Sequence, residues 1–235
     1  MRRFYVKSLT ILALATFGFL SLAVVLDRGV RVKEAGEELA YLPSARYLKP
    51  ALLGFETLAA DLFWIQTIQY FGKHVTSDRR FPKLFQLVDL VTSLDPQFIE
   101  AYRLGGLFLA YFSTDVGHAI ALYEKGIASN PDRWELPHDL ARLYYLELKD
   151  YGKALEWFQR ADQLPGRAQY IPHFVARLYA ATGQEELAVE MWWQIYHQTT
   201  NEEIKEWAKE EIQKLLTKPR EGSDGKGGTR EGETR

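Results

Sequence analysis

Histidine is the residue in this sequence best suited to metal binding or acid–base chemistry, and its spacing favours neither. No two of the five histidines are three or four residues apart, the spacing that would place two ligands on one face of a helix. No serine or threonine lies in a nucleophile motif, and no glycine-rich loop opens a helix to hold phosphate. The sequence therefore predicts no catalytic residue, no metal and no cofactor. The histidines are His74, His118, His138, His173 and His197.

Asp61 is the charged residue with the most unusual expected surroundings. In a long predicted helix, Leu58 and Ile65 share its face, whereas Thr67 marks the expected solvent side. A buried carboxylate is costly unless it is paired, so we expect a structural buried charge in an ion pair, with proton transfer as the alternative role. The candidate partners are Arg79, Arg80 and Arg103.

The composition narrows the class of protein. With 235 residues the chain is one ordinary domain with appendages or two very small domains, and 47% hydrophobic residues suffice for a packed core. Cysteine is absent, which excludes disulfides, thiolate metal sites and a cysteine nucleophile. Because 29 basic residues are balanced by 31 acidic ones, the charge does not indicate nucleic-acid binding.

An uncharged run of 19 residues, from Ser8 to Leu26, follows a short basic head. As a helix it would reach about 28 Å, close to the roughly 30 Å hydrocarbon thickness of a bilayer. We therefore predict a transmembrane signal-anchor over residues 1–26. Two alternatives stay open: a signal peptide cleaved after the small-x-small site Ser21-Leu22-Ala23, and a buried helix of a soluble domain.

The charges beside this run leave its orientation open. Three basic residues lie close to each end, so the positive-inside rule gives a tie. The short basic head is typical of a signal-anchor that keeps the N-terminus inside and exports the rest. We expect a single-pass protein of the bacterial inner membrane with a periplasmic domain, and a domain facing the cytoplasm is the alternative.

The rest of the chain divides by composition. Residues 27–49 mix charges with glycine and proline and are predicted to be a juxtamembrane spacer with room for one short helix. Residues 218–235 lack large apolar side chains and are predicted to be a disordered tail. Between them apolar residues recur every three or four positions, which is typical of helices.

An internal repeat is the strongest signal in the sequence. Several residue types return after 34 to 36 positions, a period that indicates stacked helical hairpins. The clearest recurrence relates His138, Arg142 and Tyr144 to His173, Arg177 and Tyr179. The second helices of the same two units match at Ala154 and Phe158, which correspond to Ala188 and Trp192. One unit earlier, the residues that correspond to Leu140, Ala141 and Tyr144 are Leu104, Gly105 and Phe108.

Over residues 98–196 this pattern resembles the tetratricopeptide-repeat (TPR) family. That family places Leu-Gly and a tyrosine on the first helix of each repeat, and alanine, an aromatic residue, alanine and a closing proline on the second. The matching residues are Leu104-Gly105, Phe108, Ala119, Tyr123, Gly126 and Pro131; Leu140-Ala141, Tyr144, Ala154, Phe158, Ala161 and Pro165; and Val175-Ala176, Tyr179, Gly183, Ala188 and Trp192.

The resemblance implies an all-α fold, a right-handed superhelical solenoid of about three to four hairpins. We assign a degenerate TPR-like hairpin to residues 50–97, with helices over Pro50 to His74 and Phe81 to Leu94. The TPR domain follows over residues 98–217 and ends in an amphipathic helix, Asn201 to Leu216. Its polar outer face is what the exposed end of a solenoid needs.

The family's register also implies which residues line a concave groove for partner proteins. His and Arg one turn apart in successive units suggest a basic stripe for an acidic or C-terminal peptide segment. Solvated residues with no single ligand are the alternative. The predicted protein-binding residues are Tyr102, Gly106, Leu109, His138, Arg142, Tyr145, Tyr170, His173 and Arg177.

The function expected from these features is non-covalent. We predict a membrane-anchored TPR adaptor or scaffold that binds other proteins during assembly or export of an envelope complex, such as a pilus, a secretion machine or a cytochrome system. The alternatives are a constitutive structural subunit of a membrane complex and a cytoplasm-facing adaptor. An enzyme would need converging carboxylates, which the sequence does not place.

Overall fold

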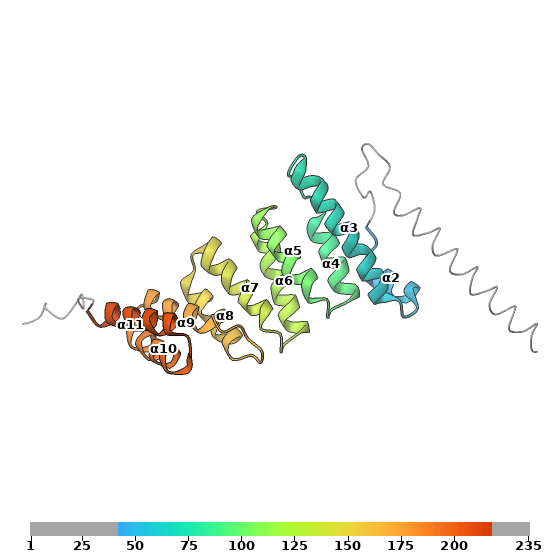
Figure 1. Cartoon of the computed structure of the whole chain (residues 1–235). Coiled ribbons are helices and arrows are strands. Elements are labelled where there is room, and N and C mark those ends of the chain that lie inside the picture. The colour runs from blue at the N-terminus through green and yellow to red at the C-terminus, as the bar shows by residue number, and fades with distance from the viewer. Residues whose placement is uncertain (1–41, 218–235) are drawn as a thin grey trace, which may run out of the picture. The chain divides into compact units, whose positions relative to one another are not determined.

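The computed structural model describes residues 42–217, which form helices and contain no strand (Figure 1). The predicted all-α class is confirmed for this part. The predicted signal-anchor (1–26), most of the spacer and the predicted tail (218–235) lie outside the described residues. Within residues 42–217, no helix combines the length and the apolar character needed to cross a membrane.

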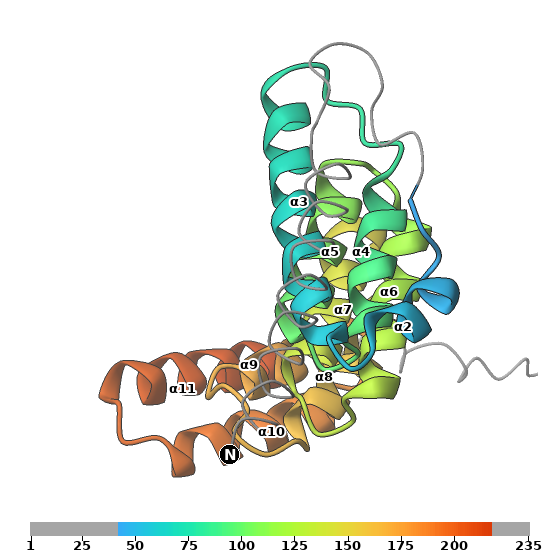
Figure 2. The ribbon, with the colours of Figure 1, turned by 90° about the vertical axis from the view of Figure 1, so that its right-hand side faces the viewer.

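Consecutive helices pair into hairpins, and Figures 1 and 2 show the hairpins stacked in chain order. A short helix comes before the first hairpin, and a final helix packs on the second helix of the last hairpin. The helices are α2 (Ala45–Leu52), α3 (Glu56–Thr76) with α4 (Leu84–Leu94), α5 (Ile99–Tyr111) with α6 (Val116–Ser129), α7 (Glu135–Leu143) with α8 (Tyr151–Asp162), α9 (Ile171–Ala181) with α10 (Glu185–Gln198), and α11 (Glu202–Thr217); α7 continues as a π-helical turn, Tyr144–Leu148.

The turn inside each hairpin has one recurring backbone feature. A residue in the left-handed region precedes the second helix in all four hairpins: Arg79 (φ +54°), Thr114 (φ +55°), Lys149 (φ +54°) and Gly183 (φ +79°). These residues are 35, 35 and 34 positions apart. Non-glycine residues rarely adopt this conformation, so its return at the repeat spacing shows that α3 and α4 form a hairpin of the same kind as the others.

The first hairpin begins later than the sequence predicted. Instead of one helix from Pro50 to His74, α2 ends at Leu52 and α3 starts at Glu56. Leu53 (φ +50°) and Gly54 (φ +95°) both lie in the left-handed region, which an α-helix cannot contain.

Glycines on α5 allow that helix to lie close to both of its neighbours. A Cβ added at Gly105 would lie 2.4 Å from Val88 Cγ1 of α4, and one added at Gly106 would lie 2.4 Å from Tyr123 Cζ of α6. A side chain at either position would force the helices apart. The Leu-Gly signal of the sequence therefore has a packing cause.

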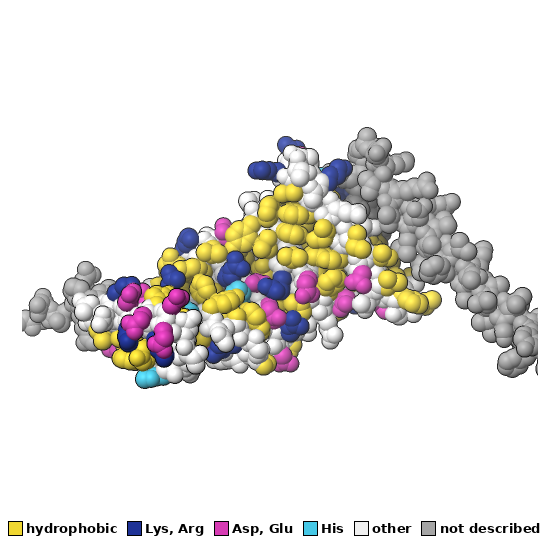
Figure 3. Space-filling model, viewed as in Figure 1, with side chains coloured by type: hydrophobic (Ala, Val, Ile, Leu, Met, Phe, Trp, Pro, Cys, Tyr) yellow, Lys and Arg dark blue, Asp and Glu magenta, His cyan; other side chains and the backbone are white. Residues whose placement is uncertain are grey.

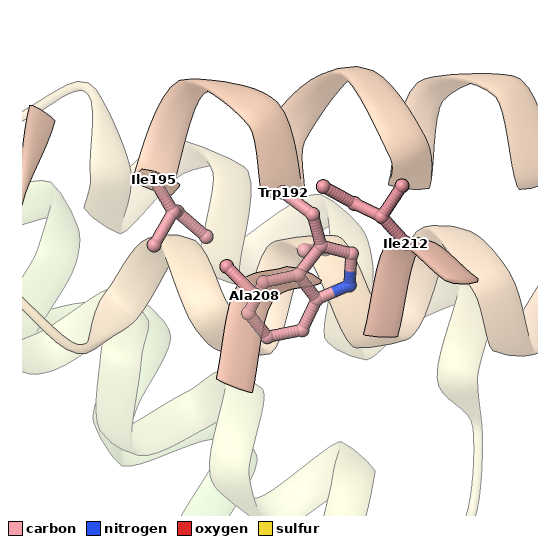
Figure 4. Close-up of a cluster of buried hydrophobic side chains, with 5 residues drawn as sticks. Trp192, Ile195, Ala208 and Ile212 are labelled. Atoms are coloured by element: carbon pink, nitrogen blue, oxygen red, sulfur yellow. The ribbon is translucent and has the colours of Figure 1, made fainter. Parts of the chain in front are cut away.

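The last hairpin is covered by α11. Trp192 and Ile195 of α10 pack against Ala208 and Ile212 of α11, and all four are buried (Figure 4). On its outer side, α11 carries Lys–Glu ion pairs three residues apart. The helix thus has one apolar side toward α10 and one charged side toward solvent, as the sequence indicates.

Candidate protein-binding site

The outward sides of α3, α5, α7 and α9 form one surface, called here the first-helix face because each is the first helix of its hairpin. On α5 the structure contradicts the predicted site. Tyr102 is 0% exposed and Leu109 is 1% exposed, and Gly106 is buried against the Tyr123 ring. These three residues belong to the core. The prediction was wrong because α5 is apolar on nearly every side, so its hydrophobic pattern does not show which side faces out.

His138 is also part of the interior, where it belongs to a polar network that joins three hairpins. Its Nδ1 lies 2.9 Å from Asp139 Oδ1, and its Nε2 lies 3.1 Å from the Tyr170 hydroxyl. Arg103 of α5 donates from Nε to Asp139 Oδ2 at 2.7 Å. Both ring nitrogens of His138 are therefore used within the protein, and its side chain, 5% exposed, is not available to a partner as the prediction required.

The order of groups in this polar network, carboxylate to imidazole to phenol, invites comparison with acid–base chains in enzymes. Burial raises the pKa of the Tyr170 hydroxyl above its ordinary value of 10.0, and the nearby Asp139 charge acts in the same direction. The phenol therefore keeps its proton and is not activated as a nucleophile. The geometry favours a link between α5, α7 and the start of α9.

His173 differs from the two arginines with which it was predicted to form a basic stripe. It lies half-buried against the Trp192 and Trp207 rings, with centroids 5.9 and 5.1 Å away. Burial lowers its pKa below 6.5, so the ring is neutral near pH 7. Of the predicted stripe, only Arg142 and Arg177 remain as cations on the face.

Arg142 is half-buried and Arg177 is exposed. Neither guanidinium has a hydrogen-bond or ion-pair partner among residues 42–217. Tyr145 lies half-buried in edge contact with Phe174, and Tyr170 is 43% exposed beside the same ring. On α7 and α9 the structure thus retains two unpaired cations flanked by aromatic side chains.

The prediction that Asp61 is a buried charge is wrong, because the residue is exposed. Helix α3 is rotated relative to the prediction: Thr67 is 0% exposed, whereas Leu58 and Ile65 are each 53% exposed. Thr67 can be buried because its hydroxyl donates to the Phe63 carbonyl oxygen at 2.7 Å. None of the expected arginine partners pairs with Asp61. Arg103 binds Asp139 instead, and Arg79 and Arg80 follow the far end of α3.

The sequence interpretation missed a set of exposed apolar side chains on the first-helix face, called here the apolar strip. Figure 3 shows hydrophobic side chains spread over α3 and α5. A signal was available: α3 has apolar residues on both sides, and a helix in an end hairpin has too few neighbours to bury both. The strip consists of Leu58, Leu62, Ile65 and Ile68 of α3, and Leu104, Tyr111 and Phe112 at α5, each between 37% and 53% exposed.

Comparison with known proteins gives structural likeness only. No family model and no curated protein matches the sequence. PilF of Pseudomonas aeruginosa is 16% identical, with 68% of this chain and 69% of that chain covered and a TM-score of 0.47. A MamA protein is 16% identical, with 69% of this chain and 91% of that chain covered and a TM-score of 0.44. A second MamA structure is also 16% identical, covering 56% and 84%, with a TM-score of 0.40.

The fold is assigned from the internal repeat of the chain. Four hairpins share one turn geometry at a spacing of 34 or 35 residues, and Gly105, Gly106 and Gly126 lie where α5 and α6 pack closely on neighbouring side chains. The described helices have the tetratricopeptide-repeat fold. Within this TPR solenoid, no group of three or more His, Asp or Glu side chains is arranged to hold a metal.

Proposed function

We propose that this TPR protein is a membrane-anchored adaptor that holds a partner protein on the first-helix face. The observation that carries the proposal is the pair of guanidinium groups, Arg142 and Arg177, without partners among the described residues. TPR hairpins place equivalent positions in line, and these two arginines are one repeat apart. Two such groups can bind carboxylates of an acidic or C-terminal segment in two-pronged fashion.

The aromatic side chains beside the arginines support the same reading. Tyr145, Phe174 and Tyr170 offer flat apolar area, and two of them carry a hydroxyl. Tyrosine gives contact area at a low cost in side-chain entropy, which suits recognition of a peptide. The polar network behind them fixes the spacing of α5, α7 and α9, so the face is held ready before a partner arrives.

The proposal includes the cellular location of the protein. An uncharged run from Ser8 to Leu26 supports a single transmembrane anchor in a bacterial inner membrane, with the repeats on the periplasmic side. There the protein would serve assembly or export of an envelope complex, such as a pilus, a secretion machine or a cytochrome system.

Proximity labelling from the C-terminus of the full-length chain in cells tests the adaptor role. Arg142→Ala with Arg177→Ala should abolish labelling of partners that the unaltered protein labels. Arg160→Ala with Lys209→Ala removes the same charge from α8 and α11 and should leave labelling unchanged. An identical set of labelled proteins for all three chains would refute the role of the arginines.

The anchor and its orientation need a separate measurement. Alkaline phosphatase fused after Arg235 should be active, and a fluorescent protein that folds only in the cytoplasm should be dark at the same position. The reverse result would place the repeats in the cytoplasm. Release of the full chain from membranes by alkaline carbonate would refute the anchor itself.

A further inference from the structure

The apolar strip is the largest unexplained feature of the described residues. Its α3 members recur at 58, 62, 65 and 68, which places them along one side of the helix. On α5, Leu104 and Tyr111 lie two turns apart, and the Phe71 and Phe108 rings stack at 3.8 Å to join the two helices. Single exposed apolar residues are ordinary, but a contiguous set on two adjoining helices is typical of a binding surface.

Gly72 extends the outward side of α3 by one turn beyond Ile68. Glycine inside a helix is unfavourable relative to alanine, so its presence calls for a packing reason. Within residues 42–217 there is none, because a Cβ added at Gly72 would have no heavy atom of this part of the chain within 4 Å. The bare backbone at this position permits close approach from outside.

The strip suits a helix better than an extended peptide. An extended segment lying on aliphatic side chains would leave its own N–H and C=O groups without partners, at a cost in free energy for each. A helix satisfies these groups internally and can present one apolar side. The exposed side of α3 from Leu58 to Gln69 is about 16 Å long, which matches three turns of a docked helix.

The charges around the strip define the partner further. Asp61 lies among its residues near the start of α3, and Lys73 lies at the opposite end, with Arg79 and Arg80 just beyond. None of these four has an ion-pair partner among residues 42–217. A helix antiparallel to α3 would meet the basic groups with its first turn and Asp61 with its last turn. Acidic residues at a helix start and basic residues at its end are also favoured by the helix dipole.

We propose that the apolar strip binds an amphipathic helix of a partner protein, antiparallel to α3, with acidic residues in its first turn and basic residues in its last. This binding surface lies on α3 and α5, whereas Arg142 and Arg177 lie on α7 and α9, and it extends the proposed function. It does not depend on those arginines.

The test uses the full-length protein in lipid nanodiscs and a fluorescent synthetic peptide of about 18 residues, long enough to form a helix. The peptide carries leucines along one side, glutamates in its first turn and lysines in its last. A matched peptide has these charges exchanged. Fluorescence anisotropy measures binding, while circular dichroism and thermal unfolding check that each variant remains folded.

We expect saturable binding of the first peptide. Leu58→Gln with Ile65→Gln should weaken it about tenfold, and Gly72→Gln should weaken it similarly while leaving the fold intact or more stable. Asp61→Lys should weaken binding of the first peptide and reduce its advantage over the second, because the lysines of its last turn would then meet a like charge. Arg142→Ala with Arg177→Ala should bind as the unaltered chain does, so this surface and the proposed acidic-segment site can fail separately.

Several outcomes would overturn the proposal. Equal binding to the unaltered and glutamine variants would place the peptide elsewhere, and no saturable binding would remove the surface. Binding that appears only after deletion of residues 1–26 would show that the chain covers the strip itself. Self-association that is lost in Ile65→Gln, without peptide binding, would make a second copy the occupant.

Discussion

The two halves of the first-helix face share the hairpin turn and differ in chemistry. Between α5, α7 and the start of α9, polar groups pair within the protein: Asp139 binds both Arg103 and His138, and His138 binds Tyr170. On α3 and the outward side of α5, aliphatic and aromatic side chains remain exposed. The hairpin turn therefore recurs along the chain, whereas the residues of each helix decide whether polar groups pair within the protein or apolar side chains stay exposed.

The largest expected difference between the two halves follows from removing Asp139, the centre of the polar network. Asp139→Ala leaves the buried His138 ring nitrogen and the Arg103 guanidinium without their acceptor, so the free energy of unfolding should fall by about 3 kcal/mol in a urea titration. Asp61→Ala, which removes an exposed carboxylate, should change it by less than about 0.5 kcal/mol. Equal losses would contradict the difference between the two halves.

A second pair of substitutions compares a ring packed beneath the apolar strip with one of the strip's exposed side chains. Phe108 is half-buried and stacks on Phe71 at 3.8 Å, so Phe108→Ala should cost about 2 kcal/mol of unfolding free energy. Ile65→Ala, at a position that is 53% exposed, should cost no more than about 0.5 kcal/mol. If Ile65→Ala is as costly as Phe108→Ala, the strip is covered within the chain.

The smallest effect concerns pH. Burial beside two tryptophans lowers the pKa of His173 below 6.5 in the folded protein. Below about pH 6.5 the unfolded chain therefore binds more protons at this residue than the folded chain, so stability falls as the pH drops through that window. Thermal unfolding at pH 7.5 and 5.5 should show a smaller loss for His173→Gln than for the unaltered chain. Parallel pH dependence would mean that the imidazole is solvated.

The fold was largely predictable because its signals are local. Helical spacing of apolar residues and the 34-to-36-residue recurrence locate the hairpins and the final amphipathic helix. The candidate site was predictable only on helices that have a polar side and an apolar side. On α7 and α9 that holds for Arg142, Tyr145 and Arg177, which face outward in the structure, at least in part.

On α3 and α5 the same method failed, for a definite physical reason. Tyr102, Leu109 and Gly106 were placed on the surface and lie in the core, while Asp61 was placed in the core and is exposed. A helix that is apolar on every side has no preferred outward side of its own. Its orientation is set by which neighbours it packs against, such as Val88 and Tyr123 beside the glycines of α5.

The sequence by itself thus determined an all-helical repeat, its period, and the uncharged run that predicts a membrane anchor. Only the tertiary structure decided that His138 and Asp139 form an internal link, that His173 is neutral, and that Leu58, Leu62 and Ile65 face outward. Periodicity is a property of one segment, whereas exposure and pairing depend on several helices packed together.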